Sequence, residues 1–146
     1  RVGNNGMFPY LSAVPATNSS VVLAMMVASL LPLVFAILAK VFGGFKSKDN
    51  ANPREFLGKQ TGAAARANAA QQNSYETLPV FLAAVIVALL FFVPLSVVTQ
   101  LAWLYVILRI IYGLAYIANW ATFRSIIWSL SLACPMMLFY LAIRLS

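Results

Sequence analysis

The chain has 146 residues, of which 62% are hydrophobic and only 9% are charged, and its formal net charge is +7. Soluble domains carry charge on about a quarter of their residues, so this composition excludes an ordinary soluble fold. Because a membrane span takes roughly 20 apolar residues, the chain has room for about four spans and for no separate soluble catalytic domain.

The residue types present restrict the chemistry further. The chain has no histidine, three acidic residues and one cysteine, Cys134, so an intrachain disulfide is impossible and a metal site is not expected. Most basic residues cluster in and just after one loop. In a membrane protein this pattern indicates topology through the positive-inside bias, and we do not interpret it as a nucleic-acid surface.

The N-terminal segment 1–20 is rich in Gly, Asn, Pro and Ser and predicts a tail outside the membrane. The chain begins with Arg1 rather than Met, which indicates either truncation or removal of a targeting peptide. A removed presequence would point to an organelle or to export. The organelle stays open.

Four apolar helices are predicted to follow this tail. Their expected ranges are 21–42, 63–93, 97–119 and 125–143. The first should be capped by Ser19 or Ser20 and end at Gly43-Gly44.

The connections differ in length and charge. Residues 45–62 are expected to form a basic surface loop, Pro94 a tight turn, and residues 121–124 a short connection before Ser125 caps the last helix. Four spans place the basic loop and Arg124 on the same side. Positive-inside counting assigns that side to the cytosol, stroma or matrix.

The second predicted helix begins with a polar stretch, RANAAQQNSYE (66–76), and continues as an apolar run. At about 100° per residue, Arg66, Asn73 and Glu76 fall on one face. Polar groups beside the hydrocarbon core are usually paired, buried or functional. This face is either the wall of a polar pocket or a solvated helix start, and the segment alone does not distinguish the two.

The third predicted helix carries a similar pattern, with Arg109, Tyr112, Tyr116 and Asn119 on one face. Glu76 is the only acid within the spans. At about 1.5 Å per residue, its depth differs from that of Arg109 by only some 6 Å. We therefore predict a Glu76–Arg109 ion pair, within one subunit or across an interface, acting either as a structural clamp or in a ligand site.

Arg124 is expected at the membrane surface, at the entrance of the last helix. An arginine in this position is most simply a topology anchor. A cation at the mouth of the pocket could instead lower the pKa of a bound thiol and favour its thiolate.

The motifs RANAAQQNSYETLPVFLA (66–83), RIIYGLAY (109–116) and Arg124-Ser125 together resemble those of the MAPEG family, the membrane-associated proteins in eicosanoid and glutathione metabolism. The resemblance covers Val21 to Ser146. It implies an all-α, four-helix transmembrane bundle that assembles as a homotrimer, with glutathione bound between neighbouring subunits. It also implies two catalytic residues, Arg124 for the thiolate and Ser125 as its hydrogen-bond donor. The glutathione-binding residues implied are Arg66, Asn73, Glu76, Arg109, Tyr112 and Tyr116.

The chain departs from the family pattern at three places. Several catalytic members have an arginine where this chain has Ala69, and many have a histidine at the position of Gln71. The interval from Tyr116 to Arg124 is one residue shorter than in the prostaglandin-forming branch.

Two functions therefore stay open. The first is a glutathione transferase or glutathione-dependent peroxidase acting on hydrophobic electrophiles or lipid peroxides. The second is a non-catalytic membrane subunit, structural or lipid-binding, docked on a larger organellar complex. A small transporter is disfavoured, because the sequence shows no repeat.

Overall fold

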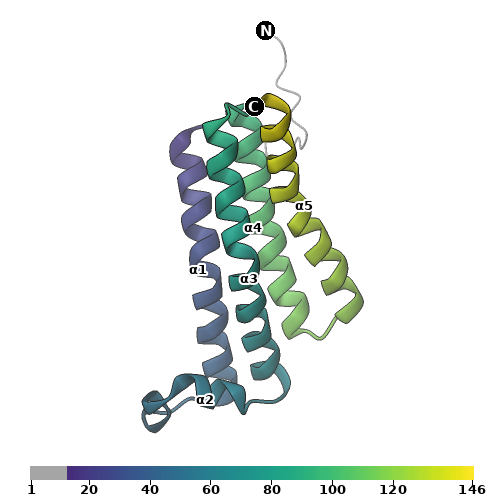
Figure 1. The fold of residues 1–146 in the computed structure, drawn as a ribbon. Coiled ribbons are helices and arrows are strands. Elements are labelled where there is room, and N and C mark those ends of the chain that lie inside the picture. Colours follow the sequence, from purple (N-terminus) through teal and green to yellow (C-terminus); the bar gives the residue numbers. More distant parts are fainter. Residues whose placement is uncertain (1–12) are drawn as a thin grey trace.

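The computed structural model describes residues 13–146, so most of the predicted N-terminal tail lies outside the described part. Four long helices run up and down along the molecule, and a short helical segment crosses one end of it (Figure 1). The long helices are α1 (Asn18–Gly43), α3 (Gly62–Leu90), α4 (Leu95–Ile117) and α5 (Ala121–Leu145). Each is long and apolar enough to cross a membrane.

The first helix begins earlier than expected. Thr17 is its N-cap, and the hydroxyl of Thr17 accepts a hydrogen bond from the backbone N–H of Ser20 at 3.1 Å. The predicted caps, Ser19 and Ser20, therefore lie inside the helix. The predicted end is confirmed, because Gly44 adopts the left-handed conformation (φ 70°) that favours glycine after a helix.

The connection expected to be a surface loop is partly helical. A 3-10 helix, η2 (Ser47–Ala51), is followed by α2 (Pro53–Gly58). Asn52 caps α2 by accepting the backbone N–H of Glu55 at 3.2 Å, and Pro53 occupies the first turn. A proline needs no hydrogen bond there, so the Asn-Pro pair begins a helix rather than only a turn.

Boundary predictions for the last two helices were wrong at their shared turn. α4 ends at Ile117, so Asn119 is not on the helix and instead adopts a positive φ of 62°. α5 begins at Ala121, and residues 121–124 form its first turn rather than a connection. Ser125 is consequently not a cap, and its hydroxyl donates to the carbonyl oxygen of Ala121 at 3.1 Å.

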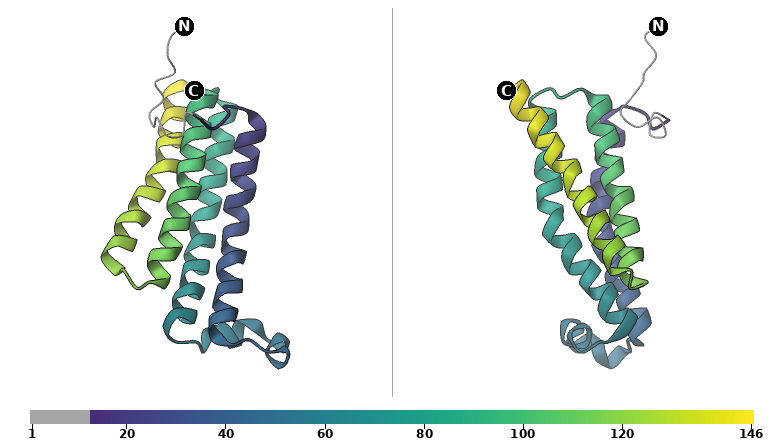
Figure 2. Two further views of the ribbon diagram at one scale, coloured as in Figure 1. Left: turned by 180° about the vertical axis from the view of Figure 1, so that it is seen from behind. Right: turned by 90° about the vertical axis from the view of Figure 1, so that its right-hand side faces the viewer.

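The three helices expected to be neighbours do pack together. α3 contacts both α4 and α5, and α4 contacts α5, while α1 packs on α3 and α4 from the other side. α5 is inclined to the other helices (Figure 2). α1 approaches α4 closely at Gly113, where an added Cβ would lie 2.0 Å from the ring of Phe35 on α1.

Candidate functional site

The site is built around Arg109, whose side chain is only 1% exposed at the centre of the α3–α4–α5 bundle. Its Nη2 donates to Oδ1 of Asn73 at 2.8 Å and to Oγ of Ser74 at 3.1 Å. Its Nη1 donates to Oγ of Ser131 on α5 at 3.4 Å. Two neighbouring helices, α3 and α5, thus supply three neutral oxygen acceptors to one buried cation on α4.

The predicted Glu76–Arg109 ion pair does not form within one chain. Glu76 is exposed, and its Oε2 instead accepts a hydrogen bond from Nδ2 of Asn73 at 3.4 Å. The reason is helical geometry, because three residues rotate by about 300° and leave Glu76 some 60° away from Asn73 around the helix. Asn73 therefore stands between the cation and the acid. A pair across a subunit interface stays a prediction.

Two aromatic rings, those of Tyr112 and Tyr116, lie between Arg109 and a second cation, Arg124. The guanidinium carbon of Arg109 lies 4.1 Å from the centroid of the Tyr112 ring. Tyr112 and Tyr116 make an edge-to-face contact with centroids 5.8 Å apart, and the guanidinium carbon of Arg124 lies 4.2 Å from the centroid of Tyr116. Cation–π contacts of this kind orient a guanidinium while leaving its N–H groups free for a ligand.

These groups surround a pocket of about 220 Å³ at the end of the bundle where α5 begins. Five of the predicted site residues line it together with one that was not predicted: Asn73, Tyr112, Tyr116, Arg124, Ser125 and Trp128. Arg109 lies behind this wall and contacts the pocket through Asn73 and Tyr112. The pocket therefore combines a cation, an amide, a serine hydroxyl and aromatic rings, a combination suited to an anionic ligand with polar and apolar parts.

Arg66, by contrast, is directed to a structural contact. Its Nε donates to the backbone carbonyl of Ile117 at 3.0 Å, at the last residue of α4. Carbonyls at a helix end have no partner within the helix, so Arg66 satisfies one of them and ties α3 to α4. It does not line the pocket.

Sequence reasoning missed three residues of the site: Ser74, Ser131 and Trp128. Ser131 follows Arg124 by seven residues, or about two helical turns, so helical periodicity could have placed it on the same face. Ser74 lies beside Asn73, but nothing in the sequence indicates that its hydroxyl turns toward Arg109. Nε of Arg109 has no hydrogen-bond partner within residues 13–146.

The profile of the MAPEG family matches residues 14–144, nearly the whole chain. The chain belongs to the MAPEG family. Together with the four long apolar helices, membership makes it an integral, multi-pass membrane protein. Comparisons with curated proteins and with solved structures gave no match.

In this MAPEG protein the candidate site lies where three of its long helices, α3, α4 and α5, meet. The resemblance inferred from the three motifs is thereby confirmed. Arg124 and the two tyrosines lie in one pocket, as the motifs predicted, whereas Arg66 and Glu76 do not line it within the single chain.

Proposed function

We propose that this MAPEG protein is a membrane-bound glutathione transferase or glutathione-dependent peroxidase acting on hydrophobic electrophiles or lipid peroxides. The observation that carries the proposal is the position of Arg124, held over Tyr116 at 4.2 Å in a pocket that also contains Ser125. A guanidinium there can stabilise a thiolate, which is the reactive form of a thiol.

Glutathione has two carboxylates and an ammonium group, and the residues around the pocket offer partners for both kinds of charge. Arg124 and the Asn73 amide are available to an anionic ligand, and the exposed Glu76 is available to an ammonium group. When bound, glutathione would supply the sulfur nucleophile that attacks an electrophilic carbon or a peroxide oxygen.

Arg124 would favour loss of the thiol proton and hold the resulting charge. The hydroxyl of Ser125 is already engaged within α5, because it donates to the Ala121 carbonyl at 3.1 Å. It must rotate away from that carbonyl before it can donate to a thiolate.

The second reactant is expected to come from the bilayer. An apolar cavity of about 310 Å³ lies between α4 and α5, farther along the bundle than the pocket, and Leu108, Leu130 and Cys134 are among the residues lining it. Such a cavity suits an apolar compound, since apolar surface is what binding there would bury.

We propose in addition that the protein is a homotrimer, with the basic end of the bundle on the cytosolic, stromal or matrix side. Glu76 supports the trimer, because it is exposed on α3 just before the apolar run and a carboxylate at this position is costly beside lipid. A neighbouring subunit would cover it.

The test is calorimetric titration of glutathione into the purified protein in detergent, with turnover of a hydrophobic electrophile measured in parallel. Glu76→Gln should abolish binding. Arg124→Ala should abolish turnover while the trimer stays intact by size-exclusion chromatography with light scattering. Unchanged turnover in Arg124→Ala would overturn the proposed role of that residue.

A second function is favoured by two observations. Ala69 stands where several catalytic members of the family have an arginine, and Nε of Arg66 donates to the Ile117 carbonyl. Both reduce the positive charge available to two carboxylates, as expected of a non-catalytic subunit in a larger membrane complex. Absence of glutathione binding, together with stoichiometric co-purification of other proteins in mild detergent, would establish this function instead.

A further inference from the structure

The η2–α2 segment (residues 46–60) lies across one end of the bundle, next to the ends of α1 and α3 (Figure 1). α1 has 26 residues. At about 1.5 Å per residue it is some 39 Å long, against a hydrocarbon core of about 30 Å. The helix ends therefore extend past the hydrocarbon, and the segment that crosses them lies at the level of the lipid headgroups.

The segment has a defined structure and is attached to the bundle. Leu57 of α2 is 8% exposed and packs with Ala39 of α1 and Ala67 of α3. The rings of Phe45 and Phe56 make an edge-to-face contact with centroids 5.1 Å apart. These contacts fix the orientation of the segment on the bundle, so the backbone positions that carry its charged side chains are fixed as well.

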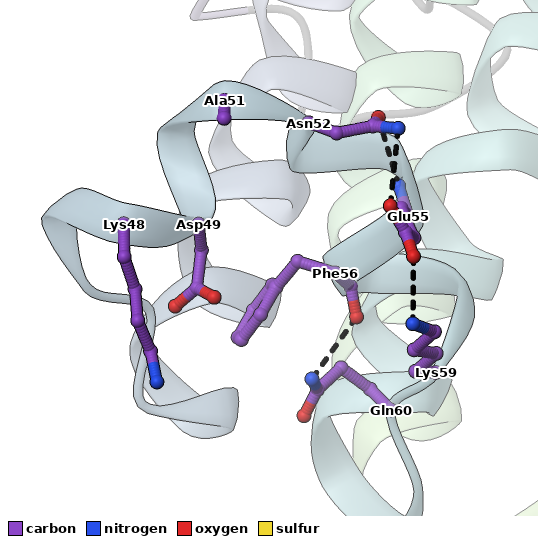
Figure 3. A pocket seen from close by; sticks show the side chains of 8 residues that line it. All are labelled: Lys48, Asp49, Ala51, Asn52, Glu55, Phe56, Lys59 and Gln60. Carbon is purple, nitrogen blue, oxygen red and sulfur yellow. Dashed lines mark hydrogen bonds and ion pairs between the residues drawn. The ribbon is translucent and has the colours of Figure 1, made fainter.

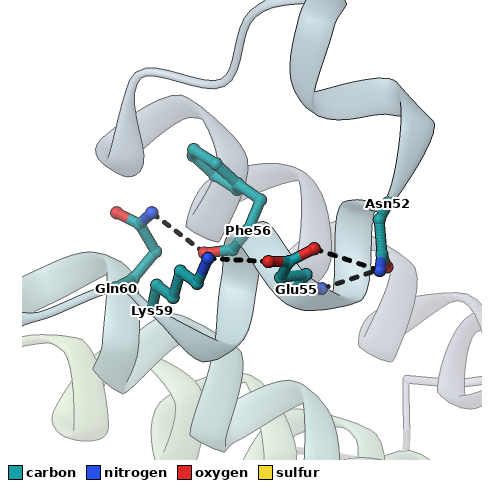
Figure 4. Close-up of polar contacts among 5 residues, drawn as sticks. All are labelled: Asn52, Glu55, Phe56, Lys59 and Gln60. Carbon is teal, nitrogen blue, oxygen red and sulfur yellow. Dashed lines mark hydrogen bonds and ion pairs between the residues drawn. The ribbon is translucent and has the colours of Figure 1, made fainter.

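Internal contacts satisfy both acids of the segment. Oδ2 of Asp49 accepts the backbone N–H of Lys46 at 2.8 Å. The carboxylate of Glu55 accepts from Nζ of Lys59 at 2.7 Å and from Nδ2 of Asn52 at 3.3 Å (Figure 4). Neither acid forms an ion pair with another cation of the segment.

Three cations of the segment have no such partner. Lys46, Lys48 and Arg54 are exposed, and within residues 13–146 none of them forms an ion pair. The segment therefore presents unpaired positive charge at the membrane surface, where an anion would complement it.

The segment also contains a pocket of about 310 Å³ between two arms, of which one is η2 and the other is α2 with the two residues that follow it. Figure 3 shows Lys48 and Asp49 on one arm, Glu55, Lys59 and Gln60 on the other, and the ring of Phe56 between them. Lys48 forms no ion pair within residues 13–146, so its ammonium is free to bind a phosphate at this pocket, and the Phe56 ring can contact the apolar part of the group that carries it.

We propose that the η2–α2 segment binds the phosphate headgroup of anionic phospholipids in the adjoining leaflet, with Lys48 at the pocket and Lys46 beside it. The lipid is favoured over other anions because the segment lies at headgroup level and is joined to two membrane helices. This site is separate from the pocket at Arg124.

The test uses the full chain in nanodiscs of phosphatidylcholine, alone or with a third of phosphatidylglycerol. Amide hydrogen exchange is measured for residues 45–62 and for the rest of the chain. Phosphatidylglycerol should increase protection of residues 45–62 in the wild type. In the double variant Lys46→Gln/Lys48→Gln, this increase in protection should be smaller than in the wild type, by about fivefold for each cation removed.

The matched control is Arg144→Gln, which removes a cation in the last turn of α5, far along the chain from the segment. It should respond to phosphatidylglycerol as the wild type does. The double variant is expected to fold, because both lysine side chains are exposed and the capping contact of Lys46 uses its backbone. Equal protection in both lipids for the wild type, or an equal gain in wild type and double variant, would overturn the proposal. Because no readout in this test depends on glutathione, the outcome of the test is independent of the proposed activity.

Discussion

Nη2 of Arg109 on α4 lies 2.8 Å from Oδ1 of Asn73 on α3, and Nδ2 of the same Asn73 lies 3.4 Å from the carboxylate of Glu76. A neutral amide thus connects a buried cation to an exposed acid. Since the carboxylate stays at the surface, it is available to a ligand or to a neighbouring subunit. None of the hydrogen bonds that Arg109 donates goes to this carboxylate.

This arrangement predicts unequal effects for two substitutions. Asn73→Ala removes the shortest hydrogen bond to the Arg109 guanidinium, and hydrogen bonds to charged groups contribute about 1.5–3 kcal/mol. We expect a loss of stability of that size in thermal unfolding of the detergent-solubilised protein. Glu76→Gln should leave stability of the ligand-free single chain almost unchanged. A larger loss for Glu76→Gln than for Asn73→Ala would contradict the assigned contacts.

The approach of α1 to α4 can be tested at Gly113. A Cβ at this position would lie 2.0 Å from the Phe35 ring, so Gly113→Ala must displace the ring or the helix. Overpacking of this kind typically costs about 1–3 kcal/mol. The unfolding temperature should fall accordingly. Gly58→Ala is the matched control, because nothing lies within 4 Å of a Cβ at Gly58, and it should be tolerated.

The turn between α4 and α5 depends on the backbone of Asn119, at φ 62°. The N–H groups of Asn119 and Trp120 donate to the carbonyls of Tyr116 and Ala115 at 3.0 and 2.9 Å, which is the Schellman pattern of a helix end. Asn119→Gly should be neutral or stabilising. Asn119→Val should cost about 1–2 kcal/mol, because a side chain without local hydrogen bonds is disfavoured in this region. Comparable unfolding temperatures for the two variants would exclude this explanation.

The Glu55–Lys59 pair gives the η2–α2 segment a defined pH dependence. The hydrogen bond and charge of Lys59 lower the pKa of Glu55 from 4.5, and the same contact raises the pKa of Lys59 from 10.5. The contribution of Glu55 is complete above its unfolded pKa and is lost as the pH falls through the lowered folded value. That of Lys59 is complete below its unfolded pKa and is lost as the pH rises through the raised folded value.

Amide protection of α2, corrected for intrinsic exchange, should therefore be constant between pH 4.5 and 10.5 and fall outside this range. Glu55→Gln should lower the protection within the plateau and remove the acid transition. A wild-type profile identical to that of Glu55→Gln would show that the pair does not stabilise the segment.

Part of the site was predictable from sequence. Tyr112 and Tyr116 lie four residues apart on one helix, and this spacing alone places them on one face. The contact of Tyr116 with Arg124 depends on α5 packing beside α4 at the correct height. In the sequence, only the resemblance to the family motifs indicated that these residues share a site, and no local pattern indicates it.

The sequence by itself determined the membrane class, the four helices and their order, because a long apolar run has no stable alternative to a helix in lipid. It also determined which residues share a helix face. Only the tertiary structure decided the partners: Asn73, Ser74 and Ser131 around Arg109, the Ile117 carbonyl for Arg66, and an exposed position for Glu76. These depend on the rotation and relative height of packed helices, where one residue turns a side chain by about 100°. Such rotations are set by packing contacts between distant segments, as at Gly113 and Phe35.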